Sequence, residues 1–530
     1  MKDIKLLDCT LRDGGFINDW NFGNGNLINL LERSVSAGID YIETGFIDEG
    51  EEFDPDRSIA PDTHSFDRLF SGTDKGGSKL FAMIDYGKCG LDKIGPKEGS
   101  VLDGIRVMIK KDTRKEAIAF CKELKKKGYL VGAQPVSVTG YDDEELKALT
   151  DEINELSPFA MYIVDTYGLL DRRHLLHIFR LIDERLDKDI KIGYHAHNNF
   201  QLAFSNSVAL LEEAGDRGVI IDGSAYGMGK SAGNCPLELL TAYMNENIGT
   251  SYHTSQILEM IDTCVLKIYE QSPWGYQMRY FLCASNDCHP KYAEYLLRKK
   301  TLSVKQTDEI LSKIEPAERL KFNGSYIEEL YRDYQRNNIN DEKALEELKE
   351  KLSGEKEILI LGPAPSLSAE KEKISEYIAD KKPIVVSINF LPEDFKIGML
   401  FLSNSKRYLQ LSSKLQKPGV PVIATSNVTC AEGEFEYNVD YASLIDESFD
   451  IPDNSLPMFL RLLKRTGAKK VTLAGFDGYV SEAGRNYSDP GMEYEFAADY
   501  AVRLNTYTKE EIKKLSDVMD ISFLTRSRYE

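Results

Sequence analysis

The stretch of the sequence with the clearest chemical potential is GYHAHNNF, where His195 and His197 stand two residues apart. Alternate residues of a strand share one face, so both imidazoles can point the same way. This spacing is frequent among metal ligands, and the chain contains only seven histidines. An isolated pair of this kind is as often two polar residues at a strand end, so its meaning depends on what lies beside it.

A second charged stretch, LDCTLRDGGF, places Arg12 and Asp13 after an apolar run and before Gly14 and Gly15, which would let the backbone turn tightly. On a protein surface such a pair is usually a charged turn. Asp13 could instead join the two histidines, and the segment GMGKSAGNCPLE adds the amide oxygen of Asn234. Oxygen and nitrogen ligands without thiolate suit Mn²⁺, Mg²⁺ or Co²⁺ and leave coordination positions open for a substrate.

These stretches meet only if the fold brings distant parts of the chain together, and the order of the predicted elements indicates such a fold. Eight short β-branched runs alternate with helical patterns in the first half of the chain. The strands are predicted at Ile4–Asp8, Tyr41–Thr44, Leu80–Ile84, Gly104–Ile109, Leu130–Gln134, Ala160–Asp165, Ile190–His195 and Val219–Asp222. The helices are predicted at Leu27–Ala37, Arg114–Lys127, Asp143–Leu156, Arg172–Leu186 and Gln201–Ala214, and the links after strands two and three are less clear.

This alternation is typical of an α/β protein with a (β/α)8 TIM barrel. A doubly wound open sheet is the alternative, but it usually has fewer strands and a G-x-G-x-x-G turn, which TLRDGG is not. In a closed barrel the first, seventh and eighth strands are neighbours, and active sites lie at the carboxyl ends of the strands. The predicted ligands would then converge on one site.

Two further regions are predicted after the barrel of residues 1–250. Residues 251–350 are helical, charged and rich in aromatic residues, and we expect them to form a helical extension. The alternation of strands and turns restarts after Gly354, so residues 355–530 are predicted to be a smaller Rossmann-like α/β domain with roughly five parallel strands.

Composition restricts the partners of the protein. The formal net charge is -20, which argues against nucleic acid and anionic membranes, because both attract basic surfaces. The first residues, MKDIKLLDCT, lack the apolar run of a signal peptide, and no stretch approaches the apolar length that spans a bilayer. The eight cysteines include no C-x-x-C pair. We therefore expect a cytoplasmic protein that binds neither nucleic acid nor membrane.

Five motifs in this order resemble one known superfamily. LDCTLRDGG, YIETGF, YIVDTYG, GYHAHNN and GMGKSAGNCPLE are similar to motifs of the metal-dependent TIM-barrel lyases and aldolases, which include 3-hydroxy-3-methylglutaryl-CoA lyase, isopropylmalate synthase and 4-hydroxy-2-oxovalerate aldolase. The helical segment around WGY looks most like the last of these branches. The resemblance implies a carbon–carbon lyase that makes or cleaves a 4-hydroxy-2-oxo acid through the enolate of pyruvate.

The resemblance also implies roles for individual residues. The implied metal ligands are Asp13, His195, His197 and, as a further ligand, Asn234. Arg12 would face the oxygen that becomes the enolate, and Glu43 would orient Arg12 or a metal-bound water. Thr166 would contact the substrate carboxylate. Positive charge placed where negative charge develops is the electrostatic term expected to dominate such a reaction.

The proton acceptor is where this sequence departs from the hydroxy-oxovalerate branch. In that branch a histidine closely follows the signature, whereas Phe16 stands at the corresponding position here. Tyr276 in PWGYQ matches a tyrosine that the branch uses near the substrate, and it could position a water or the substrate hydroxyl. His289 in NDCHP is another candidate, although packing is the more frequent role of such a histidine. Lys230 could meet a substrate carboxylate, but such a lysine is more often a solvated loop charge.

The last domain carries a weaker signal. In LILGPAPSLS, Gly362 and Ser366 lie between a strand and a helix, in a turn whose backbone amides can bind phosphate. Three further segments place Asn389, Asn404 and Asp477 at strand ends, and together they resemble the nucleotide-binding core of a sialyltransferase family from bacterial surface-polysaccharide biosynthesis. No histidine occurs after residue 289, so the catalytic histidine of those enzymes is missing. The resemblance implies a domain that binds a nucleotide or a sugar phosphate.

Three functions follow from the sequence, and the aldolase ranks first. A Claisen-type synthase that condenses an acyl-CoA with a 2-oxo acid ranks second. The third is an inactive barrel within a nucleotide-binding protein of polysaccharide biosynthesis, which the intact Arg12, Asp13, His195 and His197 argue against. We also expect a homo-oligomer, a small 2-oxo acid as substrate and, from the resemblance, a partner enzyme that processes the aldehyde.

Overall fold

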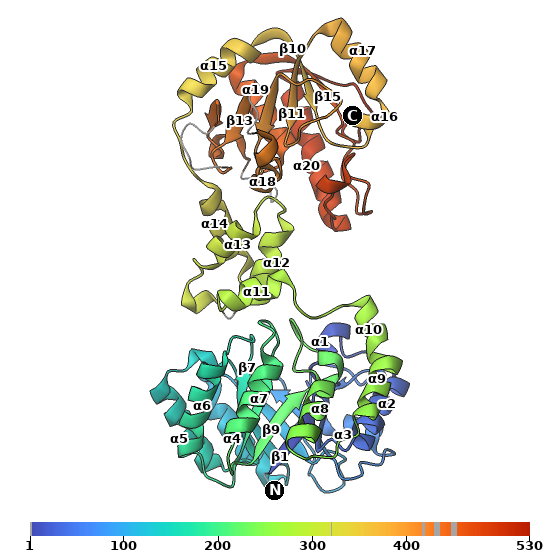
Figure 1. Ribbon diagram of the computed structural model, residues 1–530, viewed down its shortest axis with the longest axis vertical. Helices are drawn as coiled ribbons and strands as arrows, with labels where there is room; N and C mark the ends of the chain where they lie inside the picture. Colours follow the sequence, from blue (N-terminus) through green and yellow to red (C-terminus); the bar gives the residue numbers. More distant parts are fainter. Residues whose placement is uncertain (1–2, 320, 416–418, 429–434, 447–452) are drawn as a thin grey trace. The chain divides into compact units, whose positions relative to one another are not determined.

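The computed structural model describes residues 3–319, 321–415, 419–428, 435–446 and 453–530. They form two compact units, Met1–Pro290 and Lys291–Glu530, and each is described by itself (Figure 1). The last barrel helix ends at Asn247, and the second sheet begins at Gly354. The helical extension predicted over residues 251–350 is divided between the two units.

The first unit is a closed barrel of eight parallel strands. They are β1 (Ile4–Asp8), β2 (Tyr41–Ile47), β4 (Lys79–Asp85), β5 (Gly104–Ile109), β6 (Leu130–Pro135), β7 (Ala160–Asp165), β8 (Lys191–Ala196) and β9 (Val219–Gly223). Strand β1 pairs with both β2 and β9, which closes the barrel, and the short β3 (Ile59–Ala60) pairs with β2. The predicted TIM barrel is therefore confirmed, and each predicted strand overlaps an observed one.

Helices surround the barrel strands (Figure 1). They are α2 (Asn24–Ser36), α3 (Thr63–Phe70), α4 (Arg114–Lys126), α5 (Asp143–Leu156), α6 (Arg172–Arg185), α7 (Ala203–Glu213) and α8 (Leu237–Asn247). In α5 the side chain of Asp142 accepts the N–H of Glu145, and Leu146, Leu149 and Ile153 repeat on the buried face. No α-helix lies between β4 and β5, where all residues are described and only a 3-10 turn, Leu91–Lys93, forms. After the barrel come α9 (Thr254–Met260), α10 (Leu266–Gln271) and α11 (Met278–Ser285).

Strand β5 has one face in the apolar layer between strands and helices and the other face inside the barrel. Ile105, Val107 and Ile109 belong to the large apolar core that the strands share with the surrounding helices. Since side chains alternate along a strand, Arg106 and Met108 face the other way, into the barrel. Arg106 is completely buried. The sequence GIRVMI thus places a guanidinium inside the barrel while it keeps an apolar outer face.

The second unit consists of short helices followed by a parallel sheet. The helices are α12 (Pro290–Arg298), α13 (Val304–Leu311), α14 (Gly324–Gln335) and α15 (Glu342–Leu352). The strands are β10 (Gly354–Leu361), β11 (Ile384–Ile388), β12 (Met399–Leu402), β13 (Val422–Thr425), β14 (Tyr437–Val439), β15 (Ala468–Ala474) and β16 (Asp520–Phe523). A second parallel α/β domain is confirmed, but the described part of its sheet has seven strands instead of roughly five. Strand β14 is short and β16 is poorly buried, so neither is a clear apolar run in the sequence, and these two strands were not predicted.

The strand order of the second sheet reverses beside its first strand. Strands β11 to β14 lie in succession on one side of β10, and β15 and β16 lie on the other. The helices that connect these strands are α16 (Ser366–Ala369), α17 (Lys371–Lys381), α18 (Ser405–Leu415), α19 (Ser455–Thr466) and α20 (Ala498–Ser516). In open parallel sheets, such a reversal leaves a crevice at the carboxyl ends of the strands.

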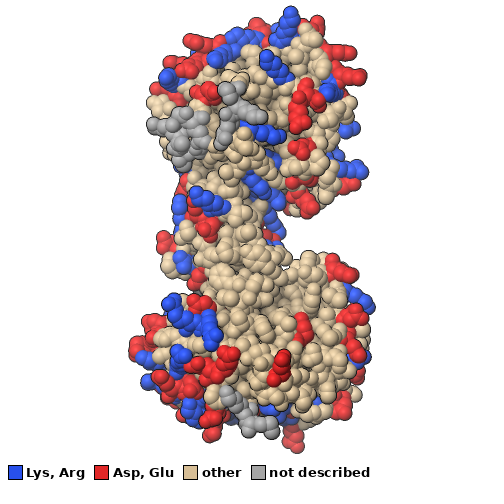
Figure 2. Space-filling view, in the orientation of Figure 1, with Lys and Arg blue, Asp and Glu red and all other residues tan. Residues whose placement is uncertain are grey.

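The surface of the chain mixes both signs of charge. Acidic and basic side chains are interspersed over both units on the face drawn in Figure 2. No helix among the described residues is long and apolar enough to cross a membrane. The cysteines in the described part of the chain are buried and form no disulfide there, and burial raises the pKa of Cys235 to about 12. The Cys235 thiol is therefore protonated at neutral pH and is no nucleophile.

Candidate metal centre

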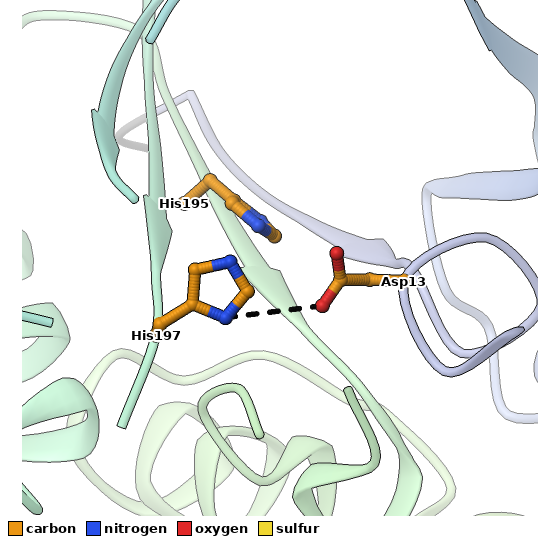
Figure 3. A group of neighbouring side chains, drawn as sticks. All are labelled: Asp13, His195 and His197. Atoms are coloured by element: carbon orange, nitrogen blue, oxygen red, sulfur yellow. Dashed lines mark ion pairs between the residues drawn. The ribbon is translucent and has the colours of Figure 1, made fainter. Parts of the chain in front are cut away.

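Three side chains from the two ends of the barrel sequence converge at the carboxyl ends of β1 and β8, the strands on either side of β9. Asp13 follows β1, His195 lies near the end of β8, and His197 follows β8 directly. Figure 3 shows the Asp13 carboxylate pointing toward the two imidazoles. Each side chain is buried, and each offers one ligand atom within 4.8 Å of the other two. The structure thus brings together the residues that the H-x-H spacing and the barrel order place on one site.

The protonation states of His197 and Asp13 fit a divalent cation. Burial lowers the pKa of His197 to about 3 despite the nearby Asp13, so the imidazole is neutral at pH 7, the form that binds metal. Burial alone would favour the neutral acid of Asp13, but the charge of Arg12 holds its pKa below the ordinary range. Nδ1 of His197 is buried without a hydrogen-bond partner in the described chain and lies 3.9 Å from Oδ2 of Asp13. An anionic oxygen beside the neutral imidazole of His197 suits Mn²⁺, Mg²⁺ or Co²⁺.

Asn234 completes this side of the site. His197 and Asn234 form an isolated antiparallel bridge, which joins the segments after β8 and β9. The amide nitrogen of Asn234 donates to Oδ2 of Asp13 at 2.7 Å and to the carbonyl of Met228 at 3.1 Å. Its Oδ1 is buried and has no hydrogen-bond partner among the described residues. Asn234 therefore holds Asp13 and keeps one oxygen available for a metal or a substrate.

Gly229 allows the segment after β9 to approach Asp13 closely. A Cβ at this position would lie 2.5 Å from Oδ2 of Asp13 and 2.2 Å from Nδ2 of Asn234. Any side chain would therefore push the carboxylate and the amide apart. The sequence motif GMGK needs its second glycine for space at the metal site, a role that the sequence alone did not indicate.

Replacing Asp13 by asparagine should lower the affinity for Mn²⁺ more than about 100-fold, the upper end of the loss when only an outer-shell partner is removed. The amide keeps the size of the carboxylate but loses the negative charge that attracts the cation. Calorimetric titration with Mn²⁺ measures the change. The matched control is Asp151→Asn, because Asp151 is exposed and pairs with Arg185 on the barrel surface. Equal affinity in both variants would exclude Asp13 as a ligand.

Arg12 is fixed on two sides and keeps one nitrogen unused. Its Nε donates to Oε2 of Glu43 at 2.6 Å, and its Nη1 donates to Oδ1 of Asp13 at 2.6 Å. Nη2 is buried without a hydrogen-bond partner among the described residues. Burial disfavours the charge, but Glu43 and Asp13 outweigh it and raise the pKa of Arg12. A permanently charged guanidinium with one unused donor edge therefore lies beside the metal group.

The turn that carries Arg12 and Asp13 depends on close packing. Gly14 has a φ of -59°, an ordinary helical conformation that any residue can adopt. The backbone at Gly14 therefore does not require the conformational freedom of glycine that the sequence suggested. A Cβ at Gly15 would lie 2.0 Å from the indole of Trp20. The Trp20 Nε1 in turn donates to the carbonyl of Arg12 at 2.8 Å. Gly15 thus makes room for the tryptophan that fixes the turn.

A chain of buried charges inside the barrel holds both Arg12 and the metal ligands. Arg106 donates from Nη1 to Oε2 of Glu43 at 2.9 Å and from Nη2 to Oδ2 of Asp222. The same Oδ2 of Asp222 lies 3.0 Å from Nδ1 of His195. This contact occupies Nδ1 and leaves Nε2 of His195 for a metal, the usual arrangement of a carboxylate behind a ligating histidine. We call Arg12, Glu43, Arg106, Asp222 and His195 the buried charge chain.

Only part of the buried charge chain was predicted from the sequence. Arg12, Glu43 and His195 were predicted site residues, whereas Arg106 and Asp222 were not. The available signal was a charged residue within each of two otherwise apolar strands, GIRVMI and VIIDG. Charged residues in such strands are rarely buried unless they are paired.

A cavity of about 60 Å³ lies beside the metal group. Its apolar walls are Phe16, Phe46, Met83, Met108, Val136 and Val164. Its remaining polar lining includes Thr166, whose Oγ1 accepts the N–H of Ser137 at 2.8 Å, and Lys230. Lys230 has no ion-pair partner in the described chain, and its Nζ lies 5.5 Å from the ring centroid of Phe16. The cavity therefore offers cationic and hydroxyl groups to a small anion.

The structure does not bring every predicted residue to this cavity. Tyr276 is 55% exposed and lies between α10 and α11, and neither Tyr276 nor His289 lines the cavity. Phe16 does line it and packs edge-on against Trp20 and Phe46. The position at which the hydroxy-oxovalerate branch carries its histidine thus holds an apolar wall.

In the second unit, a carboxylate of the protein itself contacts the predicted phosphate turn. The N–H of Ser366 donates to Oδ2 of Asp477 at 3.0 Å, and the Ser366 hydroxyl also donates to Asp477. A Cβ at Gly362 would lie 2.4 Å from the carbonyl of Gly475. Gly362 and Ser366 therefore join β10 to the segment after β15, and Asp477 takes the place that an anion would have at this amide.

The barrel unit has relatives among known proteins. Residues 102–264 match the family model described as HMGL-like. An oxaloacetate decarboxylase from Mycobacterium tuberculosis is 25% identical over 242 residues, which are 45% of this chain and 68% of the relative. A 4-hydroxy-2-oxovalerate aldolase from Geobacillus genomosp. 3 is 24% identical over 270 residues, 49% of this chain and 77% of the relative. The crystal structure of HMG-CoA lyase from Bacillus subtilis aligns with a TM-score of 0.40 and 18% identity, over 52% of this chain and 94% of that one. The barrel thus has HMGL-like homologues named as aldolases and decarboxylases.

Proposed function

We propose that the barrel unit is a divalent-metal-dependent carbon–carbon lyase that cleaves or forms a 4-hydroxy-2-oxo acid through the enolate of pyruvate. The observation that carries this proposal is the unused Nη2 of Arg12 beside the group of Asp13, His195 and His197. A divalent metal held by these ligands would supply Lewis-acid stabilisation of the 2-oxo oxygen. The HMGL-like match and the aldolase relatives support this class of reaction.

The residues of the cavity have distinct tasks in this proposal. Cleavage breaks the bond between C3 and C4. Its electron pair forms the C2–C3 double bond, and the C2–O π pair moves to the oxygen, which gives the enolate. C4 leaves as an aldehyde after its hydroxyl loses a proton to solvent water, and C3 later gains a proton from solvent to give pyruvate. Arg12 donates from Nη2 to the enolate oxygen, while Glu43 holds the guanidinium in place. Lys230 and Thr166 bind the substrate carboxylate.

A second candidate is the decarboxylation of a 2-oxo diacid such as oxaloacetate, and the lining of the cavity favours it. Apart from the metal group, the titratable side chains among the described lining residues are Arg12 and Lys230, and Phe16 replaces the expected base. Decarboxylation breaks the same C3–C4 bond and leaves the same enolate. It releases CO2, and no hydroxyl proton has to be removed. The oxaloacetate decarboxylase relative supports this candidate.

Both candidates predict that the metal-loaded protein exchanges the methyl protons of pyruvate with D2O, which NMR measures after the metal is chelated. Failure of this exchange, together with no pyruvate from either substrate, would exclude the enolate function. The products then separate the candidates. The aldolase releases pyruvate and an aldehyde from 4-hydroxy-2-oxopentanoate, and the decarboxylase releases pyruvate and CO2 from oxaloacetate.

Two controls make the comparison decisive. Free divalent ions decarboxylate oxaloacetate by themselves, so each rate is compared with the metal alone and with the Arg12→Ala protein. Release of a free thiol from an acyl-CoA in the presence of a 2-oxo acid would instead indicate the Claisen-type synthase.

A further inference from the structure

The second unit contains a cavity of about 130 Å³ at the carboxyl edge of its sheet. Pro363 follows β10, Asn389 follows β11, Asn404 follows β12 and Gly475 follows β15, and all four line the cavity. These strands lie on both sides of the reversal in strand order. Open parallel sheets bind their ligands at this place. All residues that line the cavity belong to the second unit.

A buried arginine without an acidic partner lines this cavity. Arg407 in α18 is only 4% exposed. Its Nη1 donates to the amide oxygen of Gln410 at 3.0 Å, and its Nη2 donates to the carbonyl of Met492 at 2.5 Å. Both acceptors are neutral, and Arg407 forms no ion pair with any residue that the structure describes. A buried charge without a counter-charge is costly, so the guanidinium fits an anion from outside the chain.

Two lysines add uncompensated positive charge. Lys300 lines the cavity, Lys406 precedes Arg407, and neither forms an ion pair within the described ranges. Burial lowers the pKa of Lys406, and the charges of Lys300 and Arg407 lower it further. The three cations therefore repel one another in the absence of an anion.

The acidic and other basic residues of the lining are already engaged. Lys299 pairs with Glu328 at 2.6 Å. Asp477 accepts hydrogen bonds from Ser366, and the hydroxyl of Tyr331 donates to Asp453. These contacts leave Arg407 without a carboxylate, although two carboxylates line the same cavity.

Aromatic rings surround Arg407. The guanidinium carbon lies 4.0 Å from the ring centroid of Tyr494 and 5.0 Å from that of Tyr487. The hydroxyl of Tyr494 is buried and has no hydrogen-bond partner in the described part of the chain. Tyr479 and Phe496 line the cavity as well. The walls thus offer flat apolar surfaces and one unused hydroxyl to the organic part of a ligand.

We propose that this cavity binds a phosphate ester of a small organic molecule, with the phosphate on Arg407 and Lys300. A phosphate dianion matches a cluster of more than one uncompensated cation, and the forked donors of arginine suit its oxygens. The ester group lies against the tyrosines. The proposed phosphate position at Arg407 and Lys300 differs from the amide of Ser366, which Asp477 already occupies, although Pro363 of the same turn lines the cavity. The proposal does not depend on the lyase activity of the barrel.

The test is calorimetric titration of the full-length protein, with EDTA present so that the metal group of the barrel takes no part. The probes are inorganic phosphate, ribose 5-phosphate and CMP, each compared with ribose or cytidine. Inorganic phosphate should bind with a Kd on the order of millimolar, and at least one ester should bind more tightly. The phosphate-free compounds should not bind. A preference for CMP or for ribose 5-phosphate identifies the organic part as a nucleoside or a sugar.

Variants locate the binding. Arg407→Gln should weaken phosphate binding about 10- to 100-fold, the effect of losing charge-assisted hydrogen bonds, and Lys300→Gln should weaken it by a smaller factor. Arg485→Gln is the matched control, because Arg485 is exposed, pairs with Glu482 and does not line the cavity. Lys300→Gln tests the site even if Arg407→Gln fails to fold. Absence of phosphate binding at about 10 mM, or equal binding in the Arg407 and Lys300 variants and the control, would overturn the proposal.

Discussion

Replacing Arg12 by alanine should lower the rate of pyruvate proton exchange about 10²- to 10³-fold, the loss typical for removing one donor to a developing oxyanion. The reason is geometric. Glu43 and Asp13 hold Nε and Nη1 of Arg12, and only Nη2 is left for the reacting oxygen. Metal should still bind, because Arg12 is not a ligand, but loss of its hydrogen bond to Asp13 should lower the affinity by no more than about 10- to 100-fold, the range for an outer-shell partner. Exchange kinetics by NMR and titration with Mn²⁺ measure the two quantities separately.

The variant Arg12→Lys distinguishes charge from shape. A lysine keeps the positive charge but cannot reach Glu43, Asp13 and a substrate oxygen at once, because it lacks the planar fork of donors. We expect it to stay at least about tenfold below the unchanged protein. Full exchange activity in both Arg12 variants would mean that another group meets the enolate oxygen.

Replacing Arg106 by methionine should destabilise the barrel by about 3–5 kcal/mol, the cost of removing one partner of a buried ion pair. Glu43 and Asp222 would then be buried without the cation that neutralises both. Asp222 also orients His195, so the affinity for Mn²⁺ should fall about 10- to 100-fold, as for other losses behind a ligating histidine. Denaturant unfolding and titration with Mn²⁺ measure the two effects.

The barrel offers a matched control for Arg106. Arg217 is also buried, and it donates to Asp183 and to backbone carbonyls away from the metal group. Arg217→Met should therefore also lower stability, but it should leave the affinity for Mn²⁺ unchanged. If the two variants lose metal affinity to the same degree, the loss reflects general destabilisation of the barrel and not the orientation of His195.

The Arg106 variant also has an expected pH dependence. Burial opposes ionisation of Asp222, but attraction from Arg106 outweighs it and lowers the pKa of Asp222 below its usual value. A carboxyl with a depressed pKa stabilises the folded state above its unfolded pKa, and this contribution disappears as the pH falls through the folded pKa. Without Arg106 the folded pKa of Asp222 rises. The stability contributed by Asp222 should then be lost at a higher pH than in the unchanged protein.

The barrel could be predicted from the sequence because its signals are local. Each of the eight barrel strands contains a short apolar run that can be recognised in the sequence. The spacing of His195 and His197 is enough to predict that they share one face. Arg106 and Asp222 could not be assigned in this way, because they pair with each other across the interior of the barrel, from β5 and β9, and are 116 residues apart in the sequence. Their role depends on which strands face one another, not on any local pattern.

Site residues that were predicted from a resemblance or from local composition did not all lie where they were expected. Tyr276 was assigned to the site by its motif, but the loop between α10 and α11 leaves its side chain exposed. Ser366 was assigned by the composition of its turn, and the composition gave no hint that Asp477 would accept its amide. The homo-oligomer, the cytoplasmic location and the aldehyde-processing partner stay predictions.

The buried charge chain runs without interruption from His195, a proposed metal ligand, to the guanidinium of Arg12. If a cation binds at one end, its occupancy and the alignment of Arg12 at the other end are thermodynamically linked. Linkage is reciprocal: whatever factor a bound cation contributes to the affinity for the proposed 2-oxo acid substrate, that substrate returns to the affinity for the cation. A trapped substrate analogue should accordingly slow the release of metal to a chelator, and the cation should act as a cooperative partner of the substrate.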